Sequence, residues 1–128
     1  MSIPQNTSEK PGMFTALAII TLVSGILNIF YGLTITALIV IGTIGIGLLC
    51  APITILPTIL GVFELLYAVK LLNAPQQPVR FSQAIAIMEI CCILAGNVLS
   101  AVAGILALVF YNDASVKAYF DKINSPAV

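Results

Sequence analysis

The sequence predicts an all-α fold, an integral membrane antiparallel four-helix bundle that ends in a short amphipathic helix. Of the 128 residues, 60% are hydrophobic and only 8% are charged, and the mean hydropathy is +1.14. Apolar residues fill 13–72 and 84–111. A soluble domain of this length leaves much of its surface in water, and about a quarter of its residues are charged. The composition therefore indicates that lipid is the solvent for most of the chain.

Turn signals divide the apolar residues into four expected membrane-spanning helices, because one span needs about 20 residues. Gly32 marks the end of the first, and Pro52 suits the first turn of the third. The polar segment NAPQQPVR, residues 73–80, separates the third from the fourth. The expected helices are 13–32, 34–50, 52–72 and 81–111. Three spans with a re-entrant segment near Pro52 and Pro57 are the alternative.

Polar segments flank the expected spans, which together occupy 13–112. Residues 1–12 contain two prolines and predict a flexible polar tail. At the other end, Asp113 suits a helix N-cap. After it, apolar residues recur at i, i+3, i+4 and i+7 on one helix face, at Val116, Tyr119, Phe120 and Ile123. We expect 113–128 to form an interfacial amphipathic helix on the membrane surface. A straight extension of the fourth span, packed on nothing, is the alternative.

The few charged residues argue against several classes of function. Five basic and five acidic residues give no net charge, and no basic run predicts binding to nucleic acid or to anionic lipid. The cysteines Cys50, Cys91 and Cys92 lie in or beside apolar segments, and histidine is absent. We therefore expect no metal site, no cofactor and no catalytic residue. Since no polar loop is long enough to build an active site, we do not expect an enzyme.

Basic residues are also the guide to orientation. With four spans, the face that holds both chain ends carries Lys10, Lys117 and Lys122, and the opposite face carries Lys70 and Arg80. Cytoplasmic loops are enriched in lysine and arginine. We expect a multi-pass membrane protein, and the difference of one basic residue between its two faces favours both termini in the cytoplasm.

Small residues at helical spacing predict close packing between helices. Lipid supplies no hydrophobic drive for helix association, so small side chains that let two backbones approach are favoured at the contacts. The expected packing residues are Gly25, Gly61, Gly96, Ser100 and Gly104. They fit packing within one chain, and they also fit dimerisation.

Two glutamates lie inside the apolar segments. Glu64 is about eight residues before the third helix ends, and Glu89 is about eight residues into the fourth. In an antiparallel hairpin both lie at one depth, roughly 12 Å inside at 1.5 Å per residue. Asn28 and Tyr67 fall in the same half of the bilayer, and Asn97 lies near mid-depth. These intramembrane polar residues either hold the bundle together by hydrogen bonds or form an ion or proton site. At least one glutamate should be protonated.

Two stretches, LGVFELLYAVKLL and QAIAIMEICCILAGNVLSAVAGILALVFYNDASVKAYF, resemble a group of small bacterial four-helix integral membrane proteins of unknown function. The resemblance implies a four-helix protein of the bacterial inner membrane whose pattern includes both glutamates. It implies no activity. Small multidrug transporters have a similar length, but they carry an essential acid in the first helix, where this chain has none.

The expected function is therefore that of a non-enzymatic accessory or scaffold subunit of a membrane complex. A small proton- or cation-coupled transporter or channel that uses Glu64 and Glu89 is the alternative. The expected partners are the lipid bilayer and other membrane subunits or a second copy of the chain, and nucleic acid is not among them.

Overall fold

A computed structural model describes residues 9–125, and all regular secondary structure within that range is helical. The predicted all-α class is thus confirmed. The elements in chain order are α1 (Gly12–Gly42), η1 (Ile46–Leu49), α2 (Ala51–Thr54), α3 (Leu56–Leu72), α4 (Gln83–Cys91), η2 (Cys92–Ala95), α5 (Val98–Tyr111) and α6 (Ala114–Asn124). The expected polar tail falls largely on residues 1–8, which lie outside the described residues, as do residues 126–128.

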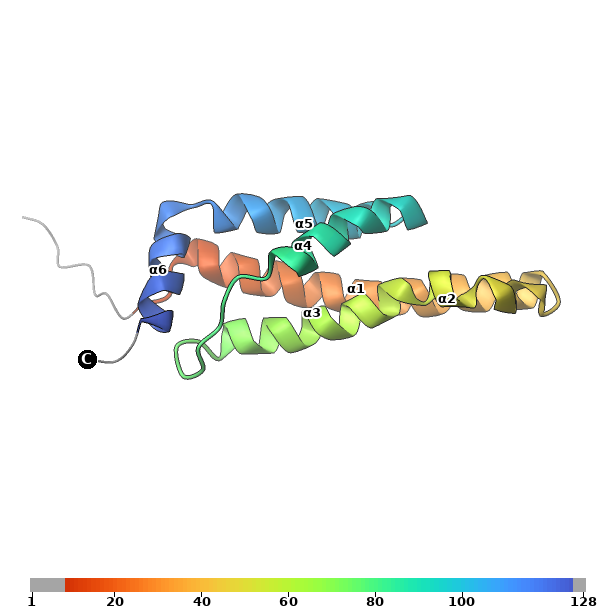
Figure 1. The fold of residues 1–128 in the computed structure, drawn as a ribbon, viewed down its shortest axis with the longest axis horizontal. Helices are drawn as coiled ribbons and strands as arrows, with labels where there is room; N and C mark the ends of the chain where they lie inside the picture. The colour runs from red at the N-terminus through yellow and green to blue at the C-terminus, as the bar shows by residue number, and fades with distance from the viewer. Residues whose placement is uncertain (1–8, 126–128) are drawn as a thin grey trace, which may run out of the picture.

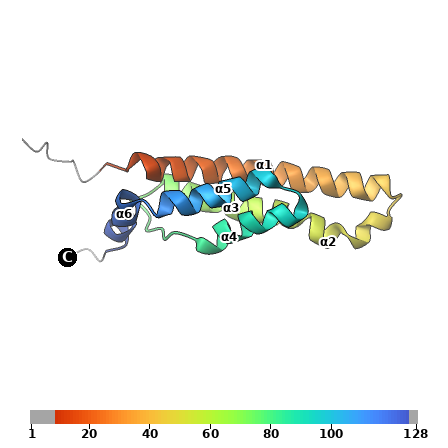
Figure 2. The same ribbon diagram turned by 90° about the horizontal axis from the view of Figure 1, so that it is seen from above.

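The helices form an elongated molecule with two different ends (Figure 1). α1 and α3 lie side by side along the long axis, α4 and α5 cover one half of that pair, and α6 lies across the end (Figures 1 and 2). At this end the Lys10 ammonium donates to the Leu72 carbonyl, and Asn124 Nδ2 donates to the Val79 carbonyl at 2.9 Å. We call this end, with Lys10, loop 73–82 and α6, the base. The opposite end, residues 43–50, is the tip.

Two helices are long and apolar enough to cross a membrane, namely α1 and the run Ala51–Leu72, in which α2 continues into α3. A third is possible if α5 and α6 are taken as one span, although they are bent by 76°. The described part of the chain thus offers two to three candidate spans by length and composition, which fits a membrane location.

The helix end expected at Gly32 is wrong, because α1 continues to Gly42. Gly32 instead lets α3 approach α1 closely, since a Cβ there would lie 2.6 Å from the Thr58 amide nitrogen. α1 ends where Ile44 and Gly45 adopt positive φ angles of 51° and 89°. The expected helix 34–50 is therefore partly an extension of α1 and partly the short η1. The expected helix 52–72 agrees with α2 and α3, and Pro52 lies in the first turn of α2.

The single helix expected over 81–111 is also wrong, because the chain reverses at residues 96–97. Gly96, at φ 78°, donates to the Ile93 carbonyl at 2.9 Å, and the Asn97 amide donates to the Cys92 carbonyl at 3.0 Å. This pair of bonds is the Schellman motif that ends a helix. The Asn97 side chain then accepts from the Ser100 amide at 3.1 Å and caps α5.

The result is a helical hairpin, residues 83–111, whose arms are each about 20 Å long at 1.5 Å per residue. Its turn lies against the middle of α1, where the Tyr31 hydroxyl donates to the Ala95 carbonyl at 2.6 Å. The helix break therefore lies at residues 96–97. The chain near Pro52 and Pro57, where the alternative expected a re-entrant segment, is helical.

Glycines mark the closest contacts between helices. A Cβ on Gly61 would lie 2.5 Å from the Gly25 carbonyl oxygen, so α1 and α3 meet backbone to backbone. A Cβ on Gly104 would lie 2.5 Å from the Ala86 carbonyl oxygen, so α5 and α4 meet in the same way. These expected packing positions are contacts within one chain. The other two differ, because Gly96 forms the hairpin turn and Ser100 joins a polar cluster described below.

α6 begins after Asp113, whose carboxylate accepts from the Ser115 amide at 2.9 Å, and the hydrogen bonds from Ser115 hold the pKa of Asp113 below its usual value. The apolar stripe faces protein and not lipid, since the Tyr119 and Phe120 rings lie 4.6 and 5.1 Å from that of Phe14. Val116 is buried as well, and Ile123 is half-buried. The unpacked straight extension is therefore wrong, because α6 bends away from α5 and closes the base of the bundle, while its position at a membrane surface stays a prediction.

Candidate functional site

Six buried polar side chains from both helix pairs meet in the middle of the molecule. We call them the polar cluster: Ser24, Asn28, Glu64, Glu89, Asn97 and Ser100. None is more than 6% exposed, and Glu64 is fully buried. α1 supplies two of them, α3 and α4 one each, and the hairpin turn with the first residues of α5 supplies the other two.

The glycine contacts explain why these side chains meet. Gly25 and Gly61 bring α1 and α3 together one helical turn before Asn28 and Glu64 respectively, so the amide and the carboxyl face each other. On the hairpin, a Cβ on Gly104 would lie 2.8 Å from the Glu89 Cβ, so the missing side chain leaves room for the glutamate. The local sequence thus places Asn28, Glu64 and Glu89 beside close helix contacts that glycine permits.

Asn28 is the centre of the hydrogen-bond network. Its Nδ2 donates to both carboxyl oxygens of Glu64, at 2.9 and 2.8 Å, and to Ser100 Oγ at 3.1 Å. Its Oδ1 accepts from Asn97 Nδ2 at 2.5 Å. One side chain of α1 is therefore bonded to α3, to the hairpin turn and to α5.

The two glutamates form a carboxyl pair. Their carboxyl groups lie close enough to interact with each other and with the Ser24 hydroxyl. Because an ionised carboxylate can only accept hydrogen bonds, a bond between Glu64 and Glu89 requires a proton on one of them. No lysine or arginine belongs to the polar cluster. The pair can thus hold one proton and share it.

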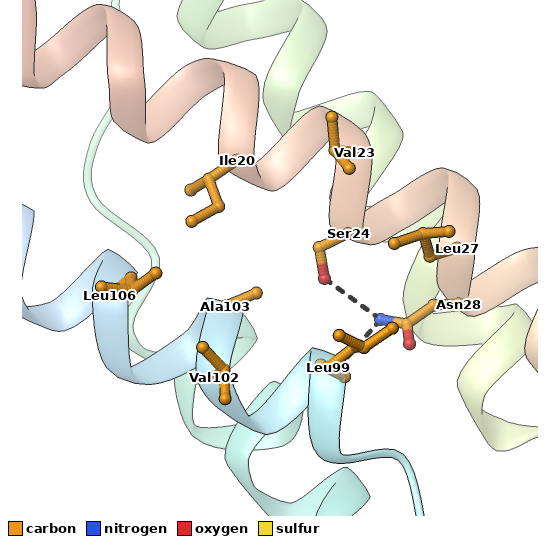
Figure 3. Close-up of a pocket in the computed structure, with 10 residues that line it drawn as sticks. Ile20, Val23, Ser24, Leu27, Asn28, Leu99, Val102, Ala103 and Leu106 are labelled. Atoms are coloured by element: carbon orange, nitrogen blue, oxygen red, sulfur yellow. Dashed lines mark hydrogen bonds between the residues drawn. The ribbon is translucent and has the colours of Figure 1, made fainter.

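A half-open pocket between α1 and α5 leads to the polar cluster from the side (Figure 3). Its volume is about 130 Å³, and Ser24, Asn28 and Ser100 supply its polar groups. The other lining residues are apolar: Ile20, Val23, Leu27, Leu99, Val102, Ala103 and Leu106. We call it the side pocket. It has room for a few water molecules, each of which takes about 30 Å³ in the liquid.

The sequence-predicted site residues do not all meet. Glu64, Glu89, Asn28 and Asn97 do, but the Tyr67 hydroxyl accepts from the Ser82 amide at 3.1 Å, nearer to the base. Ser24 was not predicted, and Ser100 was predicted only as a packing residue. Two signals could have found them, since Ser24 lies one turn before Asn28 and Ser100 lies at capping distance from Asn97.

Within residues 9–125, no group of three or more histidine, cysteine, aspartate or glutamate side chains is placed to hold a metal ion. The three cysteines are unpaired, with Cys50 and Cys91 exposed and Cys92 half-buried.

The fold and the polar cluster define an all-helical protein with two to three helices apolar enough to cross a membrane and a buried pair of acids. Comparison with known proteins finds no matching family model, no matching curated protein and no matching solved structure. The resemblance to small bacterial membrane proteins therefore stays a prediction.

Proposed function

We propose that the chain is an integral membrane protein in which α1 and the α2–α3 run cross the bilayer, while the hairpin 83–111 enters from the base and returns to it. The hydrocarbon core of a bilayer is about 30 Å thick. The arms of the hairpin are about 20 Å long and fall short of this, whereas α1 extends about 46 Å and can cross when tilted. Two crossings and a re-entrant hairpin take the place of the four crossings expected from the sequence.

The same arrangement orients the protein. All five basic residues belong to the base: Lys10, Lys70, Arg80, Lys117 and Lys122. The tip, residues 43–50, carries none. Under the positive-inside rule the base faces the cytoplasm, with both described ends of the chain. The resemblance suggests that the membrane is the bacterial inner membrane.

Within that membrane, we propose that the protein acts as a non-enzymatic accessory or scaffold subunit of a larger complex. The observation that carries this proposal is the hydrogen bonding within the polar cluster. Its buried groups are hydrogen-bonded to one another, so they hold the crossing helices and the hairpin together. Groups that are committed to internal bonds are not free to bind a reactant.

The surface of the tip half supports the same role. The hairpin covers the base half of α1, which leaves the tip half of α1 and the neighbouring α2 without a covering helix (Figure 1). Leu38 and Ile41 on α1 are 63% and 76% exposed, and Leu49 is 84% exposed. We propose that a helix of another membrane subunit packs here.

Purification in a mild detergent tests the subunit role. We expect a partner of defined stoichiometry, and we expect Leu38→Trp on the tip half to weaken its recovery. Val109→Trp, at a residue of α5 that is 57% exposed, is the matched control and should not. Recovery of the protein alone, or equal losses from both variants, would contradict the proposal.

A proton-coupled transporter is the second candidate. Two neighbouring carboxyls beside a broken helix resemble the sites of secondary transporters, and the side pocket reaches Asn28, the hydrogen-bond partner of Glu64. The test is proton flux into liposomes that contain only this protein. Flux that the double change Glu64→Gln and Glu89→Gln abolishes would favour transport over the subunit role.

A further inference from the structure

A groove at the base separates the end of α3 from the start of α4. Its volume is about 420 Å³, which lies within the range of small-molecule sites. The loop 73–82 joins the two helices beside it, and the groove is lined from both helices and from this loop. We call it the base groove. It is separate from the polar cluster and shares no residue with it.

Two cations line the base groove without an acid. Lys70 lies in the last turn of α3, Arg80 follows in the loop, and both side chains are exposed. Neither is ion-paired within residues 9–125. Asp121 lines a different depression on the α6 side, to which Arg80 also contributes. The charge of the base groove therefore suits an anion.

Two hydroxyl groups add hydrogen-bond donors. Tyr67 is 9% exposed, and its oxygen accepts from the Ser82 amide at 3.1 Å. Ser82 Oγ accepts from the Ile85 amide at 3.4 Å. In both bonds the hydroxyl is the acceptor, so its own proton can be donated. Guanidinium, ammonium and hydroxyl donors together are a set that binds phosphate oxygens.

The wall of the base groove away from the loop is apolar. Phe63 and Leu66 of α3 line it and are 55% and 59% exposed, and Ile85 of α4 faces them. These residues lie one to two turns further from the base than Lys70. A ligand that fits both parts carries a negative headgroup at the interface and an apolar chain that runs toward the middle of the bilayer.

We infer that the base groove binds an anionic phospholipid, with its phosphate between Lys70 and Arg80 and an acyl chain along Phe63 and Leu66. Basic pockets between helices on the cytoplasmic side of a membrane bind anionic headgroups in this way. The inference rests on the proposed membrane placement and not on the subunit role. It differs from the expectation from charge, because the fold gathers cations that form no basic run in the sequence.

Native mass spectrometry in detergent tests this inference, with phosphatidylglycerol and phosphatidylcholine of identical chains as the probes. We expect the wild type to retain one phosphatidylglycerol with at least tenfold preference. Each basic residue near an anionic lipid strengthens binding by roughly fivefold, so Lys70→Gln with Arg80→Gln should remove the preference. The matched control is Lys117→Gln with Lys122→Gln, which removes the same charge from α6 at the same end and should retain the preference.

Three results would overturn the inference. The preference for phosphatidylglycerol could survive in the Lys70/Arg80 double variant. Both double variants could instead lose the preference equally, which would indicate a general attraction of the lipid to the base. Soluble glycerol phosphate at millimolar concentration could displace the lipid, which would make the groove a site for a free phosphate ester. The melting temperature of each variant checks that it is folded. If the membrane placement itself is wrong, the wild type partitions into water without detergent, a result separate from all three.

Discussion

Replacing Glu64 with leucine should destabilise the protein more than replacing both glutamates with glutamine. Glu64 is fully buried, and its carboxyl accepts from Asn28 of α1 and lies near the carboxyl of Glu89 of α4. Leucine has a similar size and suits an apolar surrounding, so little of the expected loss comes from packing. The loss comes from the partners, because the Asn28 amide and the Glu89 carboxyl stay buried without their bonds.

The magnitude follows from the bonds that are removed. Asn28 donates two hydrogen bonds to Glu64, at 2.9 and 2.8 Å. Hydrogen bonds between helices in a membrane contribute about 0.6 kcal/mol on average and up to about 1.7 kcal/mol. Two such bonds correspond to about 1–3 kcal/mol for Glu64→Leu. Two glutamines can still donate and accept, so the double glutamine change should cost less than about 1 kcal/mol.

Unfolding by a denaturing detergent in mixed micelles measures these free energies. Val62→Leu is the control, since Val62 lies two residues away in α3 and is 46% exposed, and it should behave as the wild type. A Glu64→Leu variant within about 0.5 kcal/mol of the wild type would refute the reasoning, because that difference is smaller than one average bond in the network. So would a double glutamine variant that is less stable than Glu64→Leu.

Other contacts give further predictions. Gly61→Ala should lower the free energy of unfolding by about 1–3 kcal/mol because its Cβ meets the Gly25 carbonyl, whereas Gly42→Ala, with open space around it, should be neutral or stabilising; equal effects in the same titration would contradict the close contact. Gly96→Ala should cost about 1–2 kcal/mol because φ is 78° there, and an unchanged unfolding curve would argue against the hairpin turn. Phe120→Asp should release α6 for proteolysis while the rest stays folded, and unchanged cleavage would show that the ring does not hold α6 to the base.

The polar cluster was largely predictable because it depends on one boundary. The loop 73–80 is polar and contains two prolines, so the sequence alone places Glu64 and Glu89 at equal distances from it. An antiparallel pair of helices then brings the two carboxyls to one depth, wherever the other helices end. Asn28 could be added from its depth alone, because α1 begins at the first apolar residues.

The helix ends were less predictable because glycine has two uses in an apolar helix. The sequence predicts a helix end at Gly32, but this residue lies inside α1 and gives room for α3. It predicts a packing role for Gly96, but this residue ends η2 in a left-handed conformation. The adjacent Asn97 is the local signal for that break, since glycine followed by a capping residue can end one helix and begin the next. The apolar residues on both sides hide this signal.

Periodicity alone could not predict what the apolar stripe of the C-terminal helix packs against. Residues at i, i+3, i+4 and i+7 show that one face is apolar, and that face can meet lipid or protein equally well. Phe14 decides the outcome, because it lies more than 100 residues earlier and meets both Tyr119 and Phe120 at the base. Only the tertiary fold brings these rings together.

The side of the membrane on which loop 73–82 lies tests the central claim most directly. Two crossings and a re-entrant hairpin place the loop on the same side as α6, whereas four crossings place it on the opposite side. The measurement uses a background with Cys50, Cys91 and Cys92 changed to serine, and single cysteines introduced as Gln76→Cys in the loop or Lys122→Cys in α6. An impermeant maleimide should label neither variant in intact cells and both after permeabilisation. Labelling of the Gln76→Cys variant in intact cells, with the Lys122→Cys variant still protected, would contradict the account.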